Sequence, residues 1–162
     1  MILAVIEGIL LSFTLLMICV VSIRNGAVGG VHYYEKDVHD RVVEMGLITE
    51  QKIKKNQSLY GIPFFVMSII VVPVMVFYLN EASGFMEGFI QLLTAYMICN
   101  LFDRLFIDWY WVGHTKAWII PGTEDLMPYI PKNAVIRKWL QSMIMYPAFA
   151  ALLAFVFTKF IV

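Results

Sequence analysis

The chain has 162 residues, and its twelve basic residues balance its twelve acidic ones, so its formal net charge is zero. This charge gives no support for a nucleic-acid partner, which would require a basic surface. Hydrophobic residues make up 60% of the chain and charged residues 15%, and the mean hydropathy is +0.77. The length fits one domain, but the composition is not that of a soluble domain.

Four apolar runs predict membrane-spanning helices, at approximately residues 2–23, 59–79, 86–112 and 136–160. About 20 apolar residues in a helix cross a hydrocarbon core of ~30 Å. The runs are continuous rather than alternating, which excludes a transmembrane barrel. The first run lacks the basic n-region of a cleaved signal peptide and is expected to be retained. We therefore expect an all-α, polytopic membrane protein, one membrane domain over residues 1–162 with four transmembrane helices in a bundle.

The two long connections are residues 24–58 and 113–135. In the first, Val38, Val42 and Met45 recur at i, i+4 and i+7, which predicts a short amphipathic helical segment between the first two transmembrane helices. Gly46 stands where a helix-ending glycine belongs. Thr49 is a candidate N-cap for a second helical piece that leads toward the next apolar run.

Lysine and arginine are distributed unevenly between the connections. Residues 24–58 contain six and residues 113–138 contain four, whereas the N-terminus and the turn at residues 80–84 contain none and the C-terminal tail contains only Lys159. Basic residues concentrate in cytoplasmic loops. This distribution predicts a multi-pass protein of the cytoplasmic membrane, with both long connections inside and both termini outside.

The third apolar run contains a polar cluster near its cytoplasmic end. Asn100, Arg104, Asp108 and Trp111 lie at i, i+4, i+8 and i+11, one face of an α-helix, and Asp103 lies one step around it. One interpretation is a ligand site, in which Arg104 binds a carboxylate or phosphate beside an aspartate acting as a base or metal ligand. The other is a structural ion network that fixes the helix at the membrane edge, where charges are tolerated.

Glu7 is the only charge in the first apolar run. Counting ~1.5 Å per residue along each helix places it level with Gln91 and Thr94 of the third run, near the outer face. This intramembrane polar group is either a protonated Glu7 that binds Gln91 or part of a proton relay or ligand site.

His114 and Glu124 are further catalytic candidates, and Lys116 is a further ligand-binding candidate, because all three follow the polar cluster in the chain. The Pro-Gly turn at residues 120–125 either folds over the mouth of the bundle, bringing its carboxylates toward the cluster, or forms a solvated connection. His32, His39 and His114 have no ligand-motif spacing, so no metal or other cofactor is assigned. Cys19 and Cys99 lie inside apolar runs and predict neither a disulfide nor a zinc site.

Two segments carry a family resemblance. They are Asp108-Trp109 with Lys116 and Ile120-Pro-Gly-Thr-Glu, and Tyr33-Tyr34-Glu-Lys-Asp-Val with Glu44-Met-Gly-Leu-Ile-Thr49. Over about a third of the chain the sequence resembles small, uncharacterised prokaryotic four-helix integral membrane proteins. The resemblance implies a fold and a membrane location, and no activity.

Two functions are consistent with the sequence. The first is a site for an anionic ligand or lipid head group at the cytoplasmic mouth of the bundle, where Arg104 binds the anion, Asp103 and Asp108 orient it, and His114 with Glu124 supplies protons or a metal. The second is a non-catalytic accessory or transport-related subunit whose intramembrane charges are structural. The expected partners are membrane lipids and either a partner protein or a second copy of the chain. Whether the protein is an enzyme stays open.

Overall fold

Residues 1–161 are described by a computed structural model and contain no β-strand. Four helices are long and apolar enough to cross a membrane, judged by length and composition. The first is α1 (Ile2–Ile23). The second joins α3 (Glu50–Val66), η2 (Met67–Val71), α4 (Val72–Val74) and η3 (Met75–Leu79). The third joins α5 (Phe85–Phe102) to η4 (Asp103–Val112), and the fourth joins α6 (Lys132–Val156) to η7 (Phe157–Ile161). The segments η2, η3, η4 and η7 are π-helical.

The second and fourth helices begin earlier than predicted, at Glu50 and Lys132 rather than at residues 59 and 136. The apolar run marks only the part of a helix that is compatible with hydrocarbon, whereas the helix itself begins at its cap. Thr49 caps α3, because its hydroxyl accepts a hydrogen bond from the Lys52 backbone N–H at 3.3 Å. The first connection is therefore shorter than predicted, residues 24–49.

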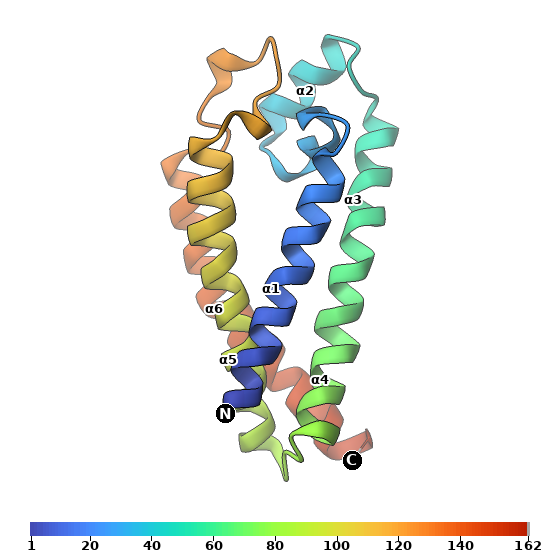
Figure 1. The fold of residues 1–162 in the computed structure, drawn as a ribbon, viewed down its shortest axis with the longest axis vertical. Helices are drawn as coiled ribbons and strands as arrows, with labels where there is room; N and C mark the ends of the chain where they lie inside the picture. The colour runs from blue at the N-terminus through green and yellow to red at the C-terminus, as the bar shows by residue number, and fades with distance from the viewer. Residues whose placement is uncertain (162) are drawn as a thin grey trace.

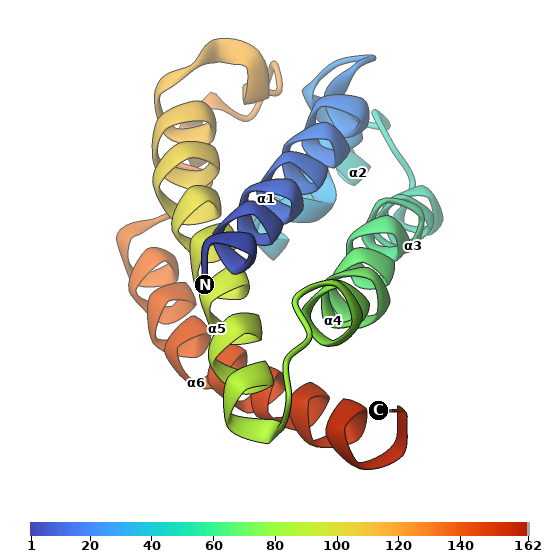
Figure 2. The ribbon, with the colours of Figure 1, turned by 60° about the horizontal axis from the view of Figure 1, so that its bottom comes forward.

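The helix α5 lies between α1 and α6, and both termini lie at the end of the molecule opposite α2 (Figure 1). Seen with the terminal end forward, α6 runs beneath α5 and reaches the side of α4 near the C-terminus (Figure 2). Gly8 lets α1 approach α5 closely, since a Cβ at this position would lie 2.9 Å from the Ala95 carbonyl oxygen. Around this contact the core of the terminal half contains Leu11, Leu92 and Ala150.

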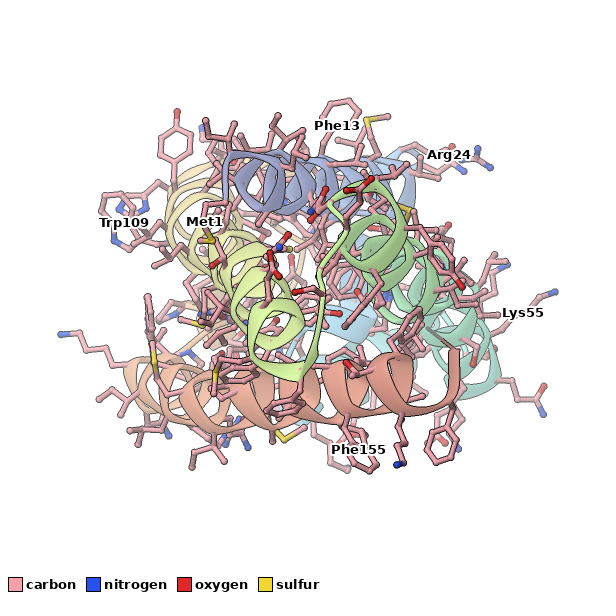
Figure 3. The ribbon with its side chains drawn as sticks, turned by 90° about the horizontal axis from the view of Figure 1, so that it is seen from below. Met1, Phe13, Arg24, Lys55, Trp109 and Phe155 are labelled. Carbon is pink, nitrogen blue, oxygen red and sulfur yellow. The ribbon has the colours of Figure 1, made fainter. Side chains whose placement is uncertain are left out.

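The outward faces of the long helices carry large apolar side chains. Phe13 of α1 and Phe155 of α6 point away from the helices on opposite sides (Figure 3), and they are 58% and 53% exposed. Trp109 of η4 also projects outward and is exposed. An exposed apolar surface of this kind is compatible with a membrane-spanning bundle.

The irregular second helix is accommodated by a neighbour. Pro73 has no backbone N–H to donate. In a π-helix the N–H of residue i+5 donates to the carbonyl of residue i. Pro73 is five residues after Ser68, so the Ser68 carbonyl has no backbone donor. The Tyr96 hydroxyl of α5 donates to this carbonyl at 2.7 Å, so a side chain of the third helix replaces the missing backbone donor.

The two long connections form one cap over the end of the helices that is opposite the termini, here called the loop end (Figure 1). The first contains η1 (Ala27–Tyr33), a 3-10 helix, and α2 (Lys36–Glu44). The second contains the short 3-10 turns η5 (Lys116–Trp118) and η6 (Glu124–Leu126). The helix α2 ends in a Schellman motif, with Gly46 at φ +70° and the Leu47 N–H donating to the Val42 carbonyl at 3.0 Å.

Tyrosine hydroxyls order the cap. The Tyr34 hydroxyl joins the two connections by donating to the Trp118 carbonyl at 2.8 Å, and the Tyr129 hydroxyl accepts from the Ile120 N–H at 3.0 Å within the second connection. Trp118 is 1% exposed and Ile120 is fully buried. Arg41 forms an exposed ion pair with Asp125 at 3.0 Å across the same boundary. The Pro-Gly turn is thus anchored to the cap by the buried Ile120 and Thr123, while Pro121, Gly122, Glu124 and Asp125 are exposed to solvent.

Candidate functional site

Four charged side chains meet near the loop end. The Arg104 guanidinium donates one hydrogen bond to Asp103 at 2.6 Å and a second hydrogen bond, from its other terminal nitrogen, to Asp108. Lys138 of α6 also donates to Asp108, at 3.3 Å. Between 13% and 26% of each side chain is exposed. We call these four residues the ion cluster. It contains two cations and two carboxylates, so it is neutral overall.

The π-helical backbone of η4 explains this arrangement. Its hydrogen bonds join residues i and i+5, and Asp103 and Asp108 are five residues apart. The two carboxylates therefore lie on the same side of the helix, where one guanidinium reaches both. A regular α-helix would turn Asp103 away from this face, as the sequence analysis expected.

A cavity of about 200 Å³ lies between the ion cluster and the cap. Its walls come from α1, η1, η4, the second connection and α6, and it is here called the mouth cavity. The residues lining it are Leu15, Cys19, Tyr33, Tyr34, Asp103, Arg104, Ile107, Asp108, Val112, Trp118, Ile130 and Lys138. Two of them carry a buried donor group without a hydrogen-bond partner, the Arg104 Nε–H and the Trp118 Nε1–H. The Tyr33 hydroxyl lies within hydrogen-bond reach of the Ser22 and Cys19 side chains.

A second cavity, of about 360 Å³, lies on the other side of Arg104 and Lys138. It runs between α3 with η2 on one side and α6 on the other, and it is here called the α3–α6 groove. Phe64, Phe65, Met145 and Phe149 line it. The Ser68 and Ser142 hydroxyls in its wall donate to carbonyls of their own helices at 2.8 and 2.7 Å. The groove surface is therefore mainly apolar, and its remaining polar groups come from Gln141, two tyrosines and the two cations.

His114 lies in a third cavity, of about 320 Å³, which it lines together with Arg104, Asp108 and Lys132. Its Nδ1 is 2.6 Å from the Trp109 carbonyl oxygen, and its ring packs edge-on against the Trp109 ring. The imidazole is exposed. The structure thus places His114 beside the ion cluster but outside the mouth cavity.

The other predicted site residues lie elsewhere. Asn100 is fully buried, and neither side-chain atom has a partner. Trp111 packs edge-on against Trp118 with ring centres 5.1 Å apart. Lys116 is exposed at the start of η5, and the Glu124 carboxylate accepts from the Gly122 N–H at 2.8 Å. The structure therefore brings Asp103, Arg104 and Asp108 together, and binds Glu124 within its own turn.

Among residues 1–161, no three histidine, cysteine, aspartate or glutamate side chains gather as they would around a metal ion. His32 is isolated from acidic groups and stacks on Tyr60 with ring centres 5.6 Å apart. Burial lowers the pKa of His32 to about 4. Cys19 and Cys99 are buried free thiols.

A second polar cluster lies at the terminal end. Asn80 Nδ2 donates to Glu7 Oε1 at 2.8 Å and to Gln91 Oε1 at 2.7 Å. Glu7 and Gln91 thus lie at one level, as the residue count predicted, but they are joined through Asn80 rather than bonded directly. Thr94 takes no part, because its hydroxyl donates to the Ile90 carbonyl of its own helix.

Lys138, Tyr33 and Trp118 were not predicted from the sequence as site residues. Lys138, Ser142 and Tyr146 lie at i, i+4 and i+8 of α6, and this polar stripe marks the face of the helix turned toward the groove. Tyr33 and Trp118 gave no such signal, because only the folding of the two connections brings them together.

Comparisons of the chain with protein-family models, curated proteins and solved structures return no match. The function must therefore be inferred from the geometry of the site.

Proposed function

We propose that this protein spans the cell membrane, with both termini outside, and binds the anionic head of a membrane amphiphile in the mouth cavity. Four long apolar helices, outward-facing phenylalanines and the excess of basic residues in the two long connections support the membrane location. On this topology the ion cluster and the mouth cavity lie at the cytoplasmic interface, the depth of lipid head groups. The proposal is for binding, and no reaction is assigned.

The observation that carries the proposal is a pair of unpartnered N–H donors on two residues that line one cavity. Buried N–H groups are nearly always hydrogen-bonded, because an unpaired one costs about 1–3 kcal/mol. The Arg104 Nε–H and the Trp118 Nε1–H are such groups, and both residues line the mouth cavity. We expect a ligand with several acceptor oxygens, such as a phosphate or a carboxylate, to satisfy them together with the Tyr33 hydroxyl on the same cavity.

Lys138 supplies the charge for an anion. Its ammonium group has three donors, and its one hydrogen bond is to an Asp108 oxygen that Arg104 also binds. Asp108 therefore keeps a cationic partner when Lys138 turns toward a ligand. An anion bound at Lys138 would also compensate for the free energy that it costs to remove the Lys138 ammonium group from water.

The experiment uses Tyr33→Phe, which removes one hydroxyl from the lining of the mouth cavity. The probe is butyl phosphate, added to the protein in phosphatidylcholine nanodiscs, and its affinity is measured by ligand-observed NMR. A hydrogen bond to a charged group contributes about 1.5–3 kcal/mol, so the variant is expected to bind about tenfold more weakly or worse. The melting temperature is measured beside the affinity, because the same hydroxyl is within hydrogen-bond reach of the Ser22 and Cys19 side chains. Tyr110→Phe, at an exposed tyrosine, is the matched control.

Equal affinity in wild type and Tyr33→Phe, or equal binding of butyl trimethylammonium and butyl phosphate by the wild type, would overturn the proposal. The second candidate function, an accessory subunit with structural charges, is favoured by one observation: Arg104 already has a carboxylate at each of two nitrogens. That function predicts that no small anion binds at all, so the same titration separates the two.

A further inference from the structure

The mouth cavity and the α3–α6 groove meet at the same two cations. Arg104 and Lys138 line both cavities, so a polar compartment with unpartnered donors and an apolar compartment lie on either side of them. This is the arrangement expected for a molecule with a charged head and a hydrocarbon chain. The inference that follows rests on the proposed function and concerns the hydrocarbon part of the ligand.

The groove has the length of one membrane leaflet. Along α6 it extends from Lys138 to Phe149, and eleven residues at a rise of 1.5 Å correspond to about 16 Å. The hydrocarbon core of a bilayer is about 30 Å thick. A chain that starts at the cations therefore reaches approximately the bilayer midplane, as a chain anchored in the nearer leaflet does.

The groove is also suited to hydrocarbon rather than to water or to empty space. Its phenylalanines and methionine offer no hydrogen bonds, and its serine hydroxyls and the Tyr96 hydroxyl already donate to backbone carbonyls. The other polar groups in its lining are Gln141, Tyr146 and the two cations. Water in a cavity requires several polar partners, and a void forfeits dispersion contacts along its walls. An opening of this kind between two helices at membrane depth is filled by an acyl or alkyl chain.

We infer that the ligand is an anionic amphiphile of the nearer leaflet, held with its head in the mouth cavity and one hydrocarbon chain in the α3–α6 groove. It enters sideways, between α3 and α6, without leaving the membrane. Lys138 lies at the junction and binds the first oxygens of the head. The groove fixes the position of the chain, and the donors of the mouth cavity provide the selectivity for an anion.

The test is photo-crosslinking with hexadecyl phosphate that carries a diazirine near the end of its chain, in phosphatidylcholine nanodiscs, with adducts located by peptide mass spectrometry. In the wild type the adducts should lie on groove residues that are shielded from the surrounding lipid, such as Phe64, Tyr96 and Phe149. Met145→Trp fills the groove, and overpacking of this kind should lower the adduct yield by about tenfold. Ile144→Trp is the matched control, because Ile144 is equally exposed on α6 but lies outside the groove lining.

Gln141→Trp with Leu140→Trp as its control repeats the test at the next turn, in case Met145→Trp fails to fold. A two-chain probe, phosphatidic acid with the same diazirine, distinguishes single-chain from two-chain ligands by its adduct yield at the groove. Butyl phosphate, which lacks a chain for the groove, should bind Met145→Trp as it binds the wild type.

Adducts spread over the outward faces of the helices, or equal adduct yields from Met145→Trp and Ile144→Trp, would overturn the inference about the groove. The proposed function would still hold in that case if the wild type binds butyl phosphate. Loss of butyl phosphate binding in the wild type itself would instead overturn the proposed function.

Discussion

Lys138 Nζ lies 3.3 Å from Asp108 Oδ2, the same carboxylate oxygen that Arg104 binds. Two cations from different helices thus share one acceptor, while Arg104 also has Asp103 as a second acceptor. Lys138 is therefore the less firmly held of the two cations. This asymmetry makes Arg104 the main partner of the two carboxylates and leaves Lys138 freer to bind a ligand.

Arg104→Ala should strongly lower thermal stability. Removing one partner from a buried ion pair costs about 3–5 kcal/mol, because a charge is left uncompensated. Asp108 would retain Lys138, whereas Asp103 would lose its only ion-pair partner. Adding Asp103→Asn to Arg104→Ala should therefore restore more stability than adding Asp108→Asn, measured as melting temperature. Equal rescue by both, or simple additivity, would mean that the residues are not coupled in this way.

Asn80→Ala should destabilise the terminal end. The Asn80 amide is the donor to both Glu7 and Gln91, and each acceptor left unpaired in the interior costs about 1–3 kcal/mol. Thr94→Val provides the control, because the Thr94 hydroxyl binds only its own helix. Thermal unfolding in detergent measures both variants. A melting temperature for Asn80→Ala no lower than that of Thr94→Val would contradict the assignment of Asn80 as the link.

Acid should destabilise the cap through His32. Burial lowers its pKa to about 4 in the folded protein, from an ordinary value near 6.5. Between these values the unfolded chain binds a proton that the folded chain does not, so stability falls as the pH falls from about 6.5 to about 4. His32→Gln should flatten this pH dependence of the melting temperature, and His114→Gln, at an exposed imidazole, should leave it as in the wild type. An unchanged slope in His32→Gln would refute this account.

The orientation is testable with introduced cysteines, because both native cysteines are buried. Ser83 lies in the exposed turn at the terminal end and Gln51 at the exposed start of α3. In intact cells, Ser83→Cys should react with an impermeant thiol reagent, and Gln51→Cys should react only after permeabilisation. The reverse pattern would invert the proposed topology and move the mouth cavity to the outer face.

Much of the fold could be predicted from the sequence, because apolar runs, a glycine at a helix end and a threonine cap are local signals. The four long helices, Gly46 and Thr49 are of this kind. The exact starts of two helices were harder to predict, because α3 and α6 begin at Glu50 and Lys132, before their apolar runs.

The site was only partly predictable, for two physical reasons. A period of 3.6 residues placed Arg104 and Asp108 on one face correctly but turned Asp103 away, because it did not include the π-helical turn of η4. Lys138 and Trp118 reach the site only through tertiary packing, which no local pattern records. One of the two interpretations of the Pro-Gly turn brought its carboxylates toward the mouth of the bundle, but Asp125 binds Arg41 and Glu124 binds its own turn.

The most direct test of the central claim is native mass spectrometry of the purified protein, comparing the wild type with Lys138→Gln. Lys132→Gln is the control, because Lys132 lies on the same helix and does not line the mouth cavity. We predict that the wild type and Lys132→Gln retain an anionic amphiphile as a bound mass, and that Lys138→Gln loses most of it while its melting temperature stays close to that of the wild type. Equal retention by all three proteins, or retention of zwitterionic lipid alone, would contradict the claim that Lys138 and the mouth cavity bind an anionic head group.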